Sequence, residues 1–297
     1  MKIKTLLIIL FLQMSGLSYA EVYSVWKNNR IYFYEENGKE IEWWINGKNT
    51  IAHLFRGEIN GPVKSWRTYN DETLITTINF CNKKKCNGEY VWRDEKNRII
   101  FKESYKNDLL NGKCSTYYKN GKLKTEADMK DNKIDGKFCI YYDTGIMKSI
   151  TNYRNGKKHG NYEQFFSTGQ KEITASYVNG KLNGEYILYN DKGKIINQIE
   201  YKNGLRDGIT KMFDQEGRLE IENMYKNDKL HGTCKEYYKS EKIKEVAEVD
   251  RKGGAYFTEY YESGAVKEKG YYSEPGIKKG KYTRFNEKGE QIEKGEY

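Results

Sequence analysis

A glycine recurs at a nearly fixed interval along most of this 297-residue chain, and this periodicity constrains the fold more than any other feature. Consecutive intervals from Gly88 to Gly232 are each 24 residues long. Self-similarity at a period of roughly 20–50 residues is typical of repeat architectures, in which each unit packs mainly on its neighbours. The sequence therefore predicts a linear array of one repeated unit, whose anchor glycines are Gly38, Gly61, Gly88, Gly112, Gly136, Gly160, Gly184, Gly208, Gly232, Gly254 and Gly280.

Most units carry an aromatic residue at the fifth position after the anchor glycine. Only 37% of the residues are hydrophobic, yet the chain has 27 Tyr, 11 Phe and 5 Trp. A chain this polar has to bury mainly its aromatic side chains if it is to fold. We therefore expect the fifth-position rings to form a repeated aromatic core, made of Trp43, Trp66, Tyr117, Tyr141, Phe165, Tyr189, Phe213, Tyr237 and Phe285.

A second glycine follows at the ninth position of most units and separates two aromatic-rich runs. The second run closes with another aromatic residue seventeen positions after the anchor, and Asn-Gly or Asn-Asp then leads into the next unit. Two such runs joined by a short glycine-containing loop are typical of a β-hairpin. The predicted turn glycines are Gly121, Gly145, Gly169, Gly193, Gly217 and Gly289.

A lone hairpin is only marginally stable in water, so neighbouring hairpins have to pair edge to edge. The sequence thus predicts an all-β protein, namely an elongated, single-layer, twisted antiparallel sheet, and we expect it to be a monomer. A helical solenoid is the alternative, which the many Gly, Asn, Tyr and β-branched residues in short runs disfavour. The aromatic columns at the second and fifth positions can share one face only if a bulge intervenes.

The segment Tyr153 to Gly169 reads Tyr-Arg-Asn-Gly-Lys-Lys-His-Gly-Asn-Tyr-Glu-Gln-Phe-Phe-Ser-Thr-Gly, and a similar pattern runs from Tyr177 to Gly193. This pattern resembles the bacterial MORN-repeat variant family. The resemblance covers about residues 38 to 297 and implies an array of hairpins. Departures are local, since Glu241 replaces one turn glycine, Val249 replaces one closing aromatic residue, and the Gly61 unit carries an insertion.

The first residues look like an export signal. Lys2 and Lys4 precede an apolar run, and Ser18-Tyr19-Ala20 offers a small-x-small cleavage pattern. A transmembrane anchor is the alternative, but the run is shorter than the roughly 20 residues needed to span a bilayer. We expect a cleaved signal peptide over 1–20, an N-terminal cap over 21–37 and tandem repeats over 38–297, in a protein that is secreted, periplasmic or at the cell surface.

Two of the five cysteines, Cys81 and Cys86, lie close together in the insertion of the Gly61 unit. Disulfides persist in exported proteins, so we expect a local Cys81–Cys86 bridge. A zinc site is the alternative, but it lacks a second pair of ligands at the usual spacing. Cys114 and Cys234 stand in the second-position column and are expected to fill space as small apolar groups. Cys139, one position further on, should face the other way.

No motif for catalysis, metal or cofactor binding is found. The sequence lacks the Gly-x-Ser-x-Gly elbow, the phosphate-binding loop and the His-Glu-x-x-His motif. His159 and His231 are three repeats apart, too far to share a ligand, and the remaining imidazole is His53. The net charge is +10, but Lys and Glu are interleaved, so we expect a solvated surface and no nucleic-acid partner.

These observations predict a protein that binds and does not catalyse. The favoured function is binding of a protein or glycan partner at the cell envelope or outside the cell, with exposed Tyr and Trp as anchors. The alternative comes from the resemblance, because many members of that family are described as antitoxin components; such a protein would neutralise a partner toxin by direct binding. Membrane association is implied by the family's early interpretation, but the sequence lacks an amphipathic Lys/Arg-rich helix.

Overall fold

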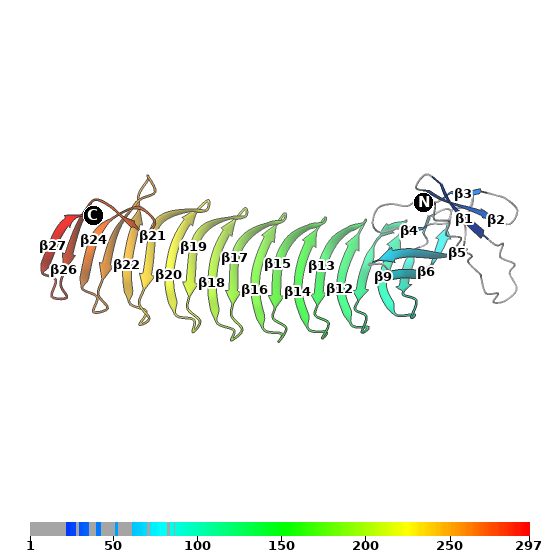
Figure 1. Cartoon of the computed structure of the whole chain (residues 1–297), viewed down its shortest axis with the longest axis horizontal. Coiled ribbons are helices and arrows are strands. Elements are labelled where there is room, and N and C mark those ends of the chain that lie inside the picture. Colours follow the sequence, from blue (N-terminus) through cyan, green and yellow to red (C-terminus); the bar gives the residue numbers. More distant parts are fainter. Residues whose placement is uncertain are drawn as a thin grey trace, which may run out of the picture. The chain divides into compact units, whose positions relative to one another are not determined.

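The computed structural model describes residues 22–27, 30–35, 40–42, 51–52, 61–69, 72–81, 84–85 and 87–297 (Figure 1). Before residue 87, side chains are described only for Leu74 and Thr76. Every regular element among the described residues is a β-strand, as the sequence predicts. The chain divides into two compact units, of which the first comprises Met1–Ile134 with Asp143–Gly145 and the second Asp135–Tyr142 with Ile146–Tyr297.

Unit 1 contains two antiparallel sheets. Strands β1 to β3 form a small three-stranded sheet, and β4 to β12 belong to a longer one in which hydrogen-bonded neighbours are also close in sequence. The bounds are β1 Val22–Lys27, β2 Arg30–Glu35, β3 Glu40–Glu42, β4 Ile51–Ala52, β5 Gly61–Tyr69, β6 Glu72–Cys81, β7 Lys84–Lys85, β8 Gly88–Arg93, β9 Ile99–Lys106, β10 Leu109–Leu110, β11 Gly112–Tyr117 and β12 Leu123–Lys130.

Unit 2 is one antiparallel meander whose strands follow one another in the order of the sequence (Figure 1). The short β25 pairs with β24, and β24 continues the sheet to β26. The bounds are β13 Lys133–Tyr141, β14 Met147–Arg154, β15 Lys157–Phe165, β16 Lys171–Val178, β17 Lys181–Tyr189, β18 Ile195–Lys202, β19 Leu205–Phe213, β20 Leu219–Lys226, β21 Lys229–Tyr237, β22 Ile243–Val249, β23 Ala255–Tyr260, β24 Val266–Glu274, β25 Ile277–Lys278, β26 Lys281–Phe285 and β27 Gln291–Glu296.

The loop inside each hairpin is a tight turn closed by a left-handed residue. Between β15 and β16, the amide of Phe166 donates to the carbonyl of Gln170 (2.9 Å) and the amide of Gly169 to that of Phe166 (2.9 Å). Gly169 has a φ of 89°, a conformation that suits glycine because it lacks a Cβ. The structure places all the predicted turn glycines in such loops, with φ between 76° and 92°: Gly121, Gly145, Gly169, Gly193, Gly217 and Gly289.

The loop between successive hairpins is a two-residue turn. Asn179 and Gly180 both have positive φ (51° and 86°), and Val178 pairs with Lys181 across them, which is the geometry of a type I′ turn. The amide of Gly180 also donates to the carbonyl of Lys158, the second residue of β15 (2.8 Å). Each of these turns is thus bonded to the strand that begins at the preceding turn, as well as closed by its own strands.

The anchor glycines lie inside strands, where they form bulges. Gly160 has a φ of 95° and pairs with Tyr177 of β16. On its other side, the register with β14 shifts between Thr151 and Tyr153. Between these pairs β15 advances from Lys158 to Tyr162 while β14 advances from Thr151 to Tyr153, so the bulge adds residues to β15 but leaves Lys158 and Tyr162 on the same face. The positive φ at the anchor position explains why a glycine, which lacks a Cβ, recurs there at a fixed interval.

One tight turn uses a glutamate where its counterparts use glycine. Glu241 has a φ of 62°, and its amide donates to the carbonyl of Tyr238 (2.9 Å), as in the glycine turns. We predict that Glu241→Gly raises the free energy of unfolding by about 0.5–1 kcal/mol, because the left-handed conformation costs a side chain about 1–2 kcal/mol and glycine gives part of this back as unfolded-state entropy. Urea denaturation measures the difference, and an unchanged or lower midpoint would contradict the prediction.

Complete burial of large side chains is concentrated in unit 1. Leu74 and Trp92 are 0% and 1% exposed, and they form a cluster with the buried Tyr90 and Ile100. In unit 2 one large ring, Phe257, is buried (2% exposed), and most of the other buried residues are small, because a single layer of sheet can hide a short side chain between two larger neighbours. Examples are Cys139, Ser149, Thr151, Ala175, Thr210 and Ala247.

Candidate binding surface

The sheet of unit 2 has one face on which most of the aromatic rings gather. Cross-strand partners share a face, and the register pairs Phe138 with Thr151, Thr151 with Tyr162, Tyr162 with Ala175 and Ala175 with Tyr186. We call this the aromatic face and define it by the second-position and seventeenth-position rings of β13 to β20. These are Phe138, Tyr153, Tyr162, Tyr177, Tyr186, Tyr201 and Tyr225.

The rings of this face stack in perpendicular pairs. Tyr162 and Tyr177 have ring centroids 6.0 Å apart at an angle of 89°, and Tyr186 and Tyr201 repeat the arrangement at 6.2 Å and 72°. Edge-to-face contacts of this kind are favourable because the ring edge is positive and the ring face negative. All these rings remain half-exposed. Burial raises the pKa of the Tyr162, Tyr177 and Tyr186 hydroxyls above the ordinary value, so they stay neutral donors.

A second row on the same face is largely apolar between β13 and β20. Ile173 pairs with Gln164 and Leu188, and Met212 pairs with Asn197 and Ile221. Met212 is 38% exposed, although it is a large hydrophobic residue. This row therefore extends the aromatic face as a half-open apolar strip, which is unusual for a protein surface without a partner.

The fifth-position rings lie on the opposite face and are not fully buried. Phe165 follows Gln164 by one position and pairs with Lys171, whose ammonium group reaches Glu163 (3.0 Å) on that face. The expected core therefore consists of half-exposed rings in the described units. These are Tyr117, Tyr141, Phe165, Tyr189, Phe213, Tyr237 and Phe285. Trp43 lies outside the described residues, and only the backbone of Trp66 is described.

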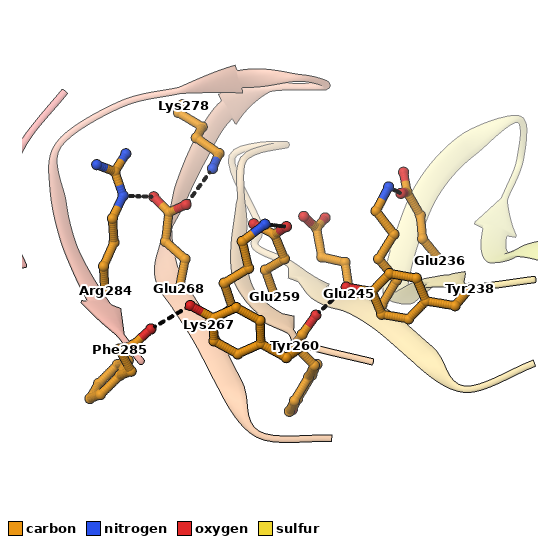
Figure 2. Close-up of polar contacts among 12 residues, drawn as sticks. Glu236, Tyr238, Glu245, Glu259, Tyr260, Lys267, Glu268, Lys278, Arg284 and Phe285 are labelled. Carbon is orange, nitrogen blue, oxygen red and sulfur yellow. Dashed lines mark hydrogen bonds and ion pairs between the residues drawn. The ribbon is translucent and has the colours of Figure 1, made fainter. Parts of the chain in front are cut away.

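Towards the C-terminal end the apolar row becomes acidic. Glu236 pairs with Glu245, Glu245 with Glu259 and Glu259 with Glu268, so four glutamates stand opposite one another on β21 to β24 (Figure 2). Like charges at such positions repel. Lysines compensate most of them, because Lys244 contacts Glu236 (3.2 Å), Lys267 contacts Glu259 (2.7 Å) and Lys278 contacts Glu268 (2.8 Å).

Glu245 accepts a hydrogen bond from the neutral hydroxyl of Tyr272 (2.9 Å), whereas each of the other three glutamates contacts a lysine. Burial raises the pKa of its carboxyl group, and the nearby Glu236 and Glu259 raise it further. A carboxyl whose folded-state pKa lies above its unfolded value stabilises the fold least when it is ionised. The ionised Glu245 therefore destabilises this end of the sheet.

We predict that Glu245→Gln raises the free energy of unfolding at pH 7 by about 0.5–1 kcal/mol, after allowing for solvent screening of a half-buried group. The gain should shrink as the pH falls and vanish below about pH 4, where Glu245 is protonated in the unfolded chain as well. Urea denaturation between pH 4 and pH 8 checks this. A gain that did not change with pH would contradict the role of ionisation.

The cysteines in the described part of the chain behave mostly as small packing groups. Cys234 pairs with Asn223 and Ala247 on the aromatic face, in the column that Tyr162 and Tyr186 occupy elsewhere. Burial raises the pKa of the Cys114 and Cys234 thiols, which are free and half-buried. The bridge expected between Cys81 and Cys86 remains a prediction, because Cys86 lies outside the described residues.

No cluster of three or more His, Cys, Asp or Glu within the described ranges has the arrangement of a metal site. A shallow, open depression of about 460 Å³ lies on the face opposite the aromatic one and is lined by Glu185, Glu200 and Lys202 among others. His159 and His231 belong to different hairpins, β15 and β21. The part of the chain that the structure describes contains no helix with the length and hydropathy of a membrane span.

Comparison with known proteins agrees with this geometry. The model of the MORN repeat variant family matches six consecutive segments, which are 110–131, 134–155, 158–179, 182–203, 206–227 and 230–250. Each match covers one hairpin of the array. No match was found among curated proteins. The family is a non-catalytic repeat family. The six tandem hairpins of residues 110–250 therefore belong to the MORN repeat variant family.

Proposed function

We propose that this protein is an exported, non-catalytic repeat protein that binds a protein or glycan partner through the aromatic face of unit 2. The observation that carries the proposal is the row of half-exposed rings on that face, from Phe138 to Tyr225, left uncovered by any other described element of unit 2. A contiguous apolar patch rimmed by polar residues is typical of an interaction site.

The composition of the face suits binding. Tyrosine supplies a large contact area with few rotatable bonds, and it is enriched among residues that dominate interface energies. The strand backbone holds each ring at a fixed spacing, so little conformational entropy is lost when a partner docks. The face therefore offers a rigid, repeated set of anchors.

A capture experiment from envelope extract tests the proposal. The bait is the mature chain, compared with the double variant Tyr177→Ala/Tyr201→Ala on the aromatic face. The matched control, Tyr189→Ala/Tyr237→Ala, removes the same atoms from half-exposed rings on the opposite face. We expect the aromatic-face variant to lose the partner and the control to keep it, while circular dichroism shows both folded. Equal capture by both variants would contradict the proposal. Recovery of a toxic protein, inactivated on binding, would favour the antitoxin-like alternative.

Export is a separate part of the proposal and rests on the first twenty residues, which lie outside the described part. We predict that N-terminal sequencing of the protein from its native cells begins at Glu21, because the peptidase recognises the small residues Ser18 and Ala20. A full-length product in the cytosol would contradict it and would favour the antitoxin-like alternative over an envelope partner.

A further inference from the structure

The edge of unit 2 that carries the type I′ turns is strongly basic. The residues flanking the turns form cross-strand pairs, which include Arg154 with Lys157, Val178 with Lys181 and Lys226 with Lys229. All of these side chains are exposed. From β14 to β21 the flanking positions are lysine or arginine except for Val178 and Leu205. We call this set the basic edge, made of Arg154, Lys157, Lys181, Lys202, Lys226 and Lys229.

Carboxylates neutralise only part of this edge. Asp207 forms an ion pair with Lys226 (3.0 Å) and also interacts electrostatically with Lys202. Asp228 forms an ion pair with Arg206 (3.1 Å). Arg154, Lys157, Lys181 and Lys229 form no ion pair with any described residue. Like charges directly opposite each other, as in Arg154 and Lys157, destabilise a sheet. The fold therefore keeps an uncompensated row of cations where alternating charges would be more stable.

The seventeenth-position tyrosines run beside this row. Tyr153 and Tyr201 immediately precede Arg154 and Lys202, and their rings lie on the aromatic face. Lys158 and Arg206 extend over the same face, with Lys158 4.9 Å from the centre of the Tyr177 ring and Arg206 4.0 Å from that of Tyr225. Each repeat thus has a ring on the aromatic face next to an edge cation that, by alternation along the strand, projects from the opposite face, so a ligand has to lie along the turns to contact both. Since one repeat adds two strands to the sheet, this combination of a ring and a cation recurs about every 10 Å along the sheet.

We propose that the basic edge, together with the tyrosines beside it, binds a linear acidic polysaccharide. The inference rests on the proposed binding function and names its ligand class. A polysaccharide with one carboxylate per disaccharide places its charges at about the spacing of the repeats, so that one cation can meet each carboxylate. The sugar rings offer C–H faces to the aromatic side chains, and neutral tyrosine hydroxyls donate to sugar oxygens. Charge complementarity and spacing together favour this ligand over a neutral glycan.

The test is a titration of the full mature chain with fluorescein-labelled hyaluronate oligosaccharides, which carry one carboxylate per disaccharide. Lys157→Glu/Lys181→Glu reverses two exposed, unpaired cations of the basic edge. Lys239→Glu/Lys288→Glu makes the same change of net charge at exposed lysines of the opposite turns, where neither side chain forms an ion pair. Fluorescence anisotropy gives the dissociation constants, and circular dichroism confirms that both variants are folded.

We expect the basic-edge variant to bind hyaluronate about tenfold more weakly and the control variant less than about threefold, since the loss of two exposed ion pairs raises a dissociation constant by about one order of magnitude. Binding should weaken as salt rises, because the contacts are solvent-exposed. Unlabelled cellohexaose, which has no charge, should not compete.

The outcomes that overturn the inference are distinct. Equal loss in both variants would show a response to net charge alone. If cellohexaose competed at the same concentration as hyaluronate, binding would not depend on the cations of the basic edge. Tighter binding of a DNA duplex or of phosphatidylglycerol vesicles, with the same dependence on the basic edge, would assign the edge to another ligand. If hyaluronate does not bind while the Tyr177/Tyr201 variant still loses a captured protein, the acidic-glycan inference fails and the proposed binding function stands.

Discussion

Replacing Trp92 by alanine is expected to lower the free energy of unfolding by about 3–5 kcal/mol, the largest effect of any single substitution considered for this chain. The ring is 1% exposed and packs in the cluster with Leu74, Tyr90 and Ile100. Its indole N–H also donates to the carboxylate of Glu103 (2.7 Å), so the substitution removes a hydrogen bond to a charged group as well as apolar contacts. Urea denaturation followed by circular dichroism measures the change.

Tyr189→Ala is the matched comparison, because it also truncates an aromatic residue at a strand position. Its ring is half-exposed, so the loss should be about 1–2 kcal/mol. Had the fifth-position column been the core, as the sequence suggests, Tyr189 would be the costlier site. A larger loss for Tyr189→Ala than for Trp92→Ala would therefore contradict the burial seen in the structure.

The hairpins were predictable because their loops depend on local chemistry. A residue with positive φ favours Gly, Asn or Asp whatever surrounds it, so Asn179-Gly180 and Gly169 mark turns in the sequence itself. The same reasoning identifies the exception at Glu241, where the turn forms although the side chain disfavours it. Here the strands on either side, and not the turn, determine the conformation.

The assignment of side chains to faces was not predictable to the same extent. The register between neighbouring strands shifts wherever a bulge adds residues, and each repeat has one such shift at its anchor glycine and another beside its tight turn, as between Gln164 and Phe165. The odd spacing of Tyr162 and Phe165 places them on opposite faces by simple alternation, but a bulge between them would put them on the same face, so the sequence alone left both arrangements open. The structure locates the bulges, and the aromatic residues then separate into two columns with different surroundings.

The acidic row illustrates a second limit. Glu236 and Glu245 belong to one repeat and Glu259 and Glu268 to the next, in which the spacing is shifted by one residue. No fixed position in the repeat contains all four, so the row emerges only from the register of four strands. The basic edge was more accessible, because its lysines flank the Asn-Gly turns directly, but the interleaved charge of the whole chain concealed it.

Deleting one complete repeat, Gly160 to Asn183, should leave a shorter protein that still folds. The cut joins His159 to Gly184, so an anchor glycine again follows the same strand, and β18 keeps its own partners on both sides. Because each hairpin contacts mainly its neighbours, the loss should be limited to about 1–4 kcal/mol, the usual share of 24 residues. Circular dichroism should keep the β-sheet spectrum, and small-angle scattering should report a shorter particle.

A half-repeat deletion, Lys171 to Leu182, is the matched control and removes half as many residues. It makes β17 the partner of β15, although both are first strands of their hairpins and carry anchor bulges at the same place, Gly160 and Gly184. Every later turn then lies on the wrong edge of the sheet. The tyrosine columns on the two sides of the cut no longer align, and the hydrogen bonds from each turn to the preceding hairpin are lost at the cut. We expect this smaller deletion to cost more stability than the whole repeat and to split the unfolding transition in two. If the 24-residue deletion unfolds the chain while the 12-residue deletion is tolerated, the stability of unit 2 does not come from the sum of neighbouring hairpins.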